Sequence, residues 1–184
     1  EIFLSLSIFS ILMIGVFLKK SFNIIFNLTS LIIIVSIAII ISSPNNEEKI
    51  FLDSFTRDAF SNYFKVLILL SSLFVLNSSK GFIVENKLDK FEYPIIILLS
   101  ILGMFFMVSS NDLILFYLGL ELQSLSLYIL ASIDRDNLRS TESGIKYFVL
   151  SALSSGLLLY GCSLLYGFTG TTNFELIANQ LNKE

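Results

Sequence analysis

The sequence predicts an all-α integral membrane protein with six transmembrane helices, and three observations support this fold class. First, 54% of the 184 residues are hydrophobic, and they gather in runs of about 18 residues or more, which are typical of membrane spans. Second, backbone groups in hydrocarbon must be hydrogen-bonded within their own segment, which favours helices. Third, runs such as "LIIIVSIAIII" lack the apolar–polar alternation of β-barrel strands.

The expected spans follow one another closely along the chain. Residues 1–168 should form one helix bundle, with spans at 2–18, 22–42, 62–79, 93–109, 111–133 and 144–168. Pro94 lies in the first turn of the fourth span, where a helix does not need the missing N–H. The chain begins without Met inside an apolar run and ends in "NQLNKE", so we expect a fragment of a longer protein.

Residues 169–184 are expected to form an amphipathic connector on the outer surface. Thr172 or Asn173 could cap its short helix. One apolar face is formed by Phe174, Ile177, Ala178 and Leu181. This pattern favours a connector that lies on the membrane interface over a device for lipid recognition.

The basic residues of the loops predict the orientation. The loops on one side, at 19–23, 80–92 and 134–143 with their flanks, hold Lys19, Lys20, Lys80, Lys87, Lys90, Arg135 and Arg139. The other side holds Lys49, Arg57 and Lys183. The richer side should face the cytoplasm, or the matrix of an organelle, so both chain ends should face outward.

Several classes of function lack the residues that they need. The net charge is −3 without a basic block, so nucleic-acid binding is not expected. The chain has no His and one Cys, Cys162, whereas disulfides, zinc sites and iron–sulfur clusters need several such residues. Nucleotide-binding glycine motifs do not occur. We therefore expect no catalytic residue, no metal site and no cofactor site in this chain.

Glu121 lies in the middle of the fifth span, where a charge costs about 2.5–3.5 kcal/mol. At helical spacing it shares one face with Tyr117, Ser124 and Tyr128, while the opposite face carries Gly119, Gln123 and Ser126. A helix that is polar on both sides should pack inside a bundle. Glu121 is then either a protonated residue that joins helices or, as we favour, a protonatable site in an ion path.

The sixth span offers a possible partner for this carboxyl. Lys146 lies near its start and could either face Glu121 or extend to the membrane interface. The same span carries a stripe of small residues suited to helix packing: Gly144, Ser151, Ser155 and Cys162. Lys65 in the third span is expected to extend to the interface, and Asp112 to cap a helix.

Two segments resemble a known family. "NDLILFYLGLELQSLSLYIL" and "STESGIKYFVLSALSSGLLLYGCSLLYGFTGTTNFE" are similar to the N-type subunit of respiratory complex I, called NADH dehydrogenase subunit two in mitochondria. The similarity covers roughly residues 94–178, and "FLDSFTRDAFSNYFKVLILL" looks like the outer loop and third helix of that family. The first two spans resemble it only in hydropathy.

The resemblance implies an antiporter-like, proton-translocating subunit built from inverted repeats of five helices, of which this chain would be the N-terminal part. The Glu of "LGLELQS" maps onto Glu121 and the Lys of "GIKYF" onto Lys146. The family pairs this Glu with a Lys on a later helix beyond the present sequence. A complete proton path is therefore not expected here.

The resemblance also implies partners and a location. NADH, FMN, iron–sulfur clusters and quinone would be handled by partner subunits of NADH:quinone oxidoreductase. Other membrane subunits of complex I and the lipid bilayer would surround the chain. The expected location is the bacterial plasma membrane or the mitochondrial inner membrane, with multiple passes.

Two other readings remain open. A subunit of a multisubunit cation/proton antiporter, without redox chemistry, would share the fold and the membrane Glu. The motifs "LGLELQSLSLY" and "YGFTGTTN" favour the respiratory subunit. A passive membrane scaffold would not need the polar face around Glu121.

Overall fold

The computed structural model describes residues 1–17, 22–43, 48–51 and 53–182 of the chain. Its elements are α1 (Ile2–Phe17), α2 (Phe22–Ser42), β1 (Glu48–Ile50), β2 (Phe55–Arg57), α3 (Ala59–Glu85), α4 (Glu92–Ser109), α5 (Leu113–Ala131), α6 (Leu138–Thr169) and α7 (Phe174–Leu181). The predicted helical membrane class is confirmed, with one small hairpin added. Three of the basic residues that predict the orientation, Lys19, Lys20 and Lys183, lie outside the described residues.

The predicted count of six spanning helices is not fully met. In the described part of the chain, five helices, α2 to α6, are long and apolar enough to cross a membrane. Helix α1 has 16 described residues, or about 24 Å at 1.5 Å per residue, and the hydrocarbon core is about 30 Å thick. Within the described residues, the span expected at 2–18 is an apolar helix, Ile2–Phe17, that is shorter than the other five.

Two helices extend well beyond the expected spans. The third was expected at 62–79 and the sixth at 144–168, but α3 runs to Glu85 and α6 begins at Leu138. Lys80 and Arg139 therefore lie in helices and not in loops. Apolar runs show only which part of a helix lies in lipid. Charged residues such as Lys, Arg and Glu are good helix formers, so the helix can continue beyond the apolar run.

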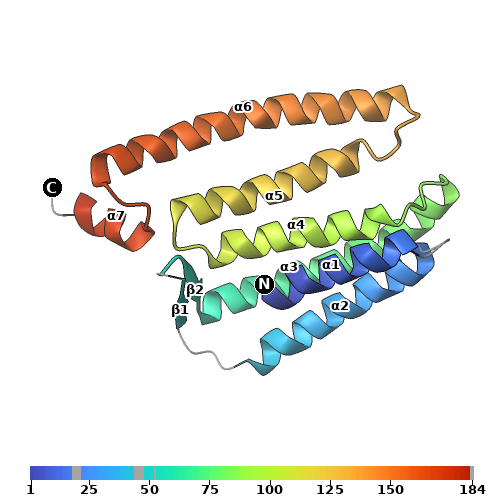
Figure 1. Ribbon diagram of the computed structural model, residues 1–184, viewed down its shortest axis with the longest axis horizontal. Coiled ribbons are helices and arrows are strands. Elements are labelled where there is room, and N and C mark those ends of the chain that lie inside the picture. Colours follow the sequence, from blue (N-terminus) through green and yellow to red (C-terminus); the bar gives the residue numbers. More distant parts are fainter. Residues whose placement is uncertain (18–21, 44–47, 52, 183–184) are drawn as a thin grey trace.

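The helices form a layered bundle with α4 at its centre (Figure 1). Helices α1, α2 and α3 lie on one side of α4, and α5 and then α6 lie on the other. The hairpin, the α4–α5 turn and α7 gather at one end of the bundle, and the α3–α4 and α5–α6 loops at the opposite end. We call these the outer end and the inner end, after the orientation predicted from the basic residues.

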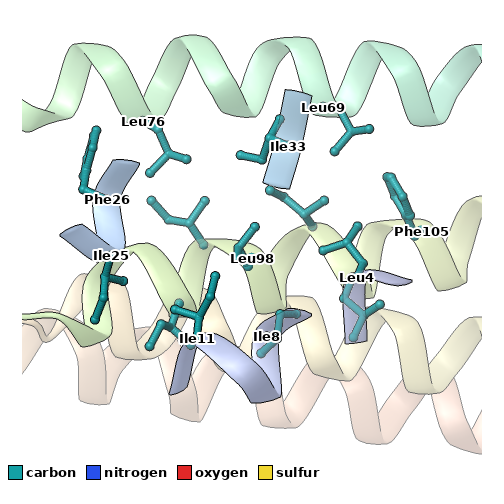
Figure 2. Close-up of a cluster of buried hydrophobic side chains, with 14 of the residues drawn as sticks. Leu4, Ile8, Ile11, Ile25, Phe26, Ile33, Leu69, Leu76, Leu98 and Phe105 are labelled. Carbon is teal, nitrogen blue, oxygen red and sulfur yellow. The ribbon is translucent and has the colours of Figure 1, made fainter. Parts of the chain in front are cut away.

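The hydrophobic core lies among the first four helices. Leu98 and Ile101 of α4 are fully buried and pack against side chains of the three preceding helices. Figure 2 shows Leu98 in the same cluster as Leu4, Ile8 and Ile11 of α1, Ile25, Phe26 and Ile33 of α2, and Leu69 and Leu76 of α3. By contrast, Gly144 is the only buried residue of α6. The surface of α6 is therefore open to lipid or to further protein.

Backbone hydrogen bonds connect the loops at the outer end. The N–H of Asn111 donates to Ser54 O over 2.8 Å, and the N–H of Leu113 donates to Thr172 O over 2.9 Å. Asp112 caps α5, as predicted, by accepting from Ile114 N–H at 2.8 Å. Of the two predicted caps of α7, Asn173 is the observed one, since its Oδ1 accepts from the backbone N–H groups of Glu175 and Leu176.

Candidate functional site

Helix α5 places two unlike faces against its neighbours, and the first face touches α4 through backbone. A Cβ atom added to Gly103 of α4 would lie 2.6 Å from Gln123 N and 2.7 Å from Gly119 O. A Cβ atom on Gly119 would lie 2.9 Å from both Gly103 O and Met107 N. The two helices thus approach so closely that only glycine fits at the crossing.

The second face of α5 meets α6 through hydroxyl groups. The hydroxyl of Tyr128 donates a hydrogen bond to the Ser151 hydroxyl oxygen of α6. The Tyr128 ring also lies edge-on to Tyr147 at 4.9 Å and to Phe148 at 5.7 Å between ring centroids. Nearer the outer end, the Tyr117 side chain interacts with Glu121 and with the Ser155 hydroxyl. This face is polar along about three helical turns.

Glu121 is placed on the α6 side of α5 and is half-buried. Its Oε1 atom is buried and has no hydrogen-bond partner among the described residues. Ser124 does not supply one, because its hydroxyl donates to the backbone oxygen of Glu121 at 3.0 Å. A buried oxygen without a partner is costly and uncommon in native structures.

Three side chains were expected to support Glu121, and the structure separates their roles. Tyr117 lies one turn away and interacts with the carboxyl group. Ser124 bonds to backbone, and Tyr128 bonds to Ser151 of α6. Only Tyr117 is therefore placed to orient the Glu121 carboxyl directly, because the other two hydroxyls donate elsewhere.

Lys146 is not beside Glu121. Its ammonium lies 2.5 Å from Glu142 Oε1, one helical turn earlier, and the Lys146 side chain is 69% exposed. On α6, Ser155 is the residue that interacts with Tyr117, the neighbour of Glu121. Ser155 lies nine residues after Lys146, which corresponds to about 14 Å along the helix. The structure therefore places Lys146 toward the inner end of α6 and gives it a partner of its own.

Among the glycines of α6, Gly144 is the one that packs closely against another helix. A Cβ atom on Gly144 would lie 2.6 Å from the Ser132 Cβ atom at the end of α5. Cys162 is half-buried and unpaired, and it lines a hollow between α5 and α6 with Tyr117 and Tyr166.

Among the described residues, no group of His, Cys, Asp and Glu side chains could hold a metal ion.

Lys65 forms an ion pair with Glu1 that the sequence did not predict, so the prediction that Lys65 extends to the interface is wrong. The Lys65 side chain is 8% exposed and its ammonium lies 2.7 Å from Glu1 Oε1. Ser109 donates a hydrogen bond of 2.9 Å to the same oxygen. Lys65 lies on the face of α3 that points into the bundle, so it meets Glu1 there and does not extend to the interface. No sequence spacing links residues so far apart in the chain.

Comparisons with known proteins find relatives of this chain. A model of the NADH:quinone oxidoreductase/Mrp antiporter transmembrane region matches residues 110–184, which include α5, α6 and α7. The NADH-quinone oxidoreductase subunit N of Pelagibacter ubique is 52% identical over 99% of the chain, and that of Bartonella bacilliformis is 49% identical over 99%. Over nearly its whole length, the chain is similar to these N-type subunits. It spans 39% and 37% of the lengths of these two relatives.

Two solved structures contain chains with a similar fold. A chain of respiratory complex I from Thermus thermophilus matches with a TM-score of 0.79 and 26% identity, over 93% of this chain and 37% of that one. A chain of the archaeal membrane-bound sulfane sulfur reductase matches with a TM-score of 0.76 and 22% identity, over 96% of this chain and 38% of that one. The second match shows a shared fold.

Proposed function

We propose that this chain is the N-terminal part of a membrane subunit that translocates protons in an NADH:quinone oxidoreductase. The observation that carries the proposal is the position of Glu121. It is a half-buried carboxyl in the middle of a spanning helix, with one buried oxygen left without a partner. Carboxyl groups at this depth are rare and usually belong to ion paths.

The surroundings of Glu121 suit a group that changes its protonation state. Desolvation favours the neutral acid, and an approaching cation favours the anion. The unpaired oxygen leaves room for such a change, since no fixed hydrogen bond stabilises either form there. Tyr117 and Ser155 could orient the carboxyl and pass protons through bound water toward α6.

Lys146 would act as a second protonatable group nearer the inner end. Its ion pair with Glu142 is exposed in the described part of the chain, so the pair can exchange partners at little cost. Charge movement between this pair and Glu121 would need an intermediate cation on a later helix of the full subunit. This division matches the pairing of the membrane Glu with a later Lys that the family resemblance implies.

The redox chemistry would take place on partner subunits in the same membrane complex. NADH oxidation, with FMN and iron–sulfur clusters, and quinone reduction would drive conformational or electrostatic changes in this subunit. Moving one charge against 100 mV requires about 2.3 kcal/mol, which the redox reaction must supply. The relatives named above are bacterial, so the membrane would be the bacterial plasma membrane.

The test is Glu121→Gln in the full-length subunit within its assembled complex. Gln keeps the size and hydrogen-bonding capacity of Glu but cannot ionise. We expect assembly to be retained while NADH-driven proton uptake into membrane vesicles falls by about 100-fold or more, the range of a lost proton-transfer group. Glu121→Asp should retain more uptake than Gln, because it keeps a carboxyl group.

Glu175→Gln is the matched control, since Glu175 is an exposed carboxylate at the outer end. It should leave proton uptake unchanged. Wild-type uptake in Glu121→Gln would overturn the proton-site proposal and leave Glu121 as a residue that joins helices.

A cation/proton antiporter subunit is the alternative, because the matching family model names both classes. Deleting the full-length gene distinguishes them. Loss of NADH:quinone oxidoreductase activity in membranes supports the respiratory proposal. Loss of growth at high sodium, with normal NADH oxidation, supports the antiporter.

A further inference from the structure

A groove opens at the inner end of the bundle, between α4, α5 and α6. Its volume is about 560 Å³. Most of its wall is apolar and is formed by Ile96, Leu125, Ile129, Ile133, Ile145 and Phe148. Leu125 lies six residues before the end of α5, which corresponds to a depth of about 9 Å. The groove therefore reaches from the helix ends into the apolar part of the bundle.

Charged side chains lie at the mouth of this groove. Lys90 and Arg135 line it together with one carboxylate, Glu92, so these three side chains carry a net charge of +1. The Lys90 ammonium donates to the backbone oxygen of Ile133 at 3.4 Å, which holds it over the opening. Neither cation forms an ion pair with a carboxylate of the described residues.

The two cations come from the two loops at the same end of the bundle. Lys90 belongs to the α3–α4 loop and Arg135 to the α5–α6 loop. Basic side chains at helix ends lie at the level of lipid headgroups, and basic pockets between helices on the cytoplasmic side bind anionic headgroups. An apolar wall below such a pair matches an acyl chain below a phosphate.

We propose that this groove binds one anionic glycerophospholipid. Its single phosphate would lie between Lys90 and Arg135, which matches the net charge of +1 at the mouth. One acyl chain would lie along α5 and α6 against Ile129 and Phe148. Phe148 also packs on Tyr128, so the lipid would fill space beside the hydroxyl-lined face of α5.

The experiment uses the purified full-length complex, reconstituted in phosphatidylcholine vesicles with a small fraction of phosphatidylglycerol that carries a photoactivatable acyl chain. Mass spectrometry then locates the cross-linked peptides. We expect labelling of α5 and α6 residues on the groove wall. One basic residue near an anionic headgroup contributes about 5-fold in binding, so Lys90→Gln should weaken labelling about 5-fold and the Lys90→Gln/Arg135→Gln double variant about 25-fold.

Lys87→Gln is the matched control, because it removes the same charge from the same loop, and Lys87 does not line the groove. It should label like the wild type. Unlabelled phosphatidylglycerol should compete with the probe, whereas phosphatidylcholine and inorganic phosphate should not. The proposal is overturned by labelling that both variants retain, by equal competition from phosphatidylcholine, or by an unlabelled groove in the wild-type complex. Proton uptake plays no part in this readout, so the result is independent of the proposed function.

Discussion

The two faces of α5 differ in what they are made of. Toward α4, the contact is backbone against backbone at Gly103 and Gly119, with less than 3 Å left for any added Cβ atom. Toward α6, the contact is made by side chains, among them the Tyr128–Ser151 hydrogen bond, and the Oε1 atom of Glu121 on this face has no hydrogen-bond partner among the described residues. One helix thus has a rigid face and a face whose contacts can change.

This difference suits the proposed role of Glu121, a group whose surroundings would change while its own position is held. Backbone contacts at a glycine crossing have one geometry, because nothing in them can rotate. Hydroxyl contacts can exchange partners or accept water at a cost of about 1 kcal/mol each. The α4 face can therefore fix the position of Glu121, while the α6 face allows its environment to change.

The largest effect is expected from a side chain placed at the rigid crossing. Gly103→Leu would drive a side chain into the backbone of α5, so the two helices would have to separate. We expect about 3 kcal/mol of destabilisation, because overpacking at backbone cannot be relieved by a change of rotamer. Assembled complex in membranes and its melting temperature are the measurements. Gly81→Ala, where an added Cβ meets nothing within 4 Å, is the control, and an equal loss there would contradict the prediction.

A smaller and reversible effect is expected at the α6 face. Gly144→Ala would bring a Cβ atom to 2.6 Å from the Cβ atom of Ser132, with an expected cost of about 1–2 kcal/mol. Here the obstacle is a side chain, so adding Ser132→Gly should restore most of the stability. Melting temperatures of the two single variants and the double variant test this. If the double variant is no more stable than Gly144→Ala, the contact is not the one described.

Removing one hydroxyl from the α6 face should have a modest effect. Tyr128→Phe keeps the ring contacts with Tyr147 and Phe148 and removes the hydrogen bond to Ser151. The expected destabilisation is about 1 kcal/mol, measured by thermal unfolding of the purified complex. Tyr160→Phe serves as the control, because Tyr160 is an exposed tyrosine on α6. Removing its hydroxyl should leave the melting temperature unchanged.

The smallest effect is expected at the outer end. Glu175 of α7 forms an ion pair of 2.6 Å with Lys49, and both side chains are about half exposed. Exposed pairs contribute about 0.2–1 kcal/mol, so Glu175→Gln should change the melting temperature little, and less at high salt than at low salt. A loss as large as that of Gly103→Leu would show that the outer end, and not the glycine crossing, holds α5 in place.

Local sequence patterns predicted much of the fold. The apolar runs located the helices, because burial in lipid requires long uninterrupted apolar segments. They did not locate the helix ends of α3 and α6, since helices continue into water wherever the residues favour helix. For α1, the described helix Ile2–Phe17 follows the predicted run.

The two faces of α5 could be read from helical spacing, and the partners of those faces could not. The sequence by itself determined that Glu121 lies mid-span, with hydroxyls on its side and Gly119 opposite, because 100° per residue fixes which residues share a face. Only the tertiary structure decided that Gly119 meets Gly103, that Lys146 pairs with Glu142 and that Lys65 is buried against Glu1. The physical reason is that helical periodicity is local, whereas the neighbour of a face depends on how distant helices pack.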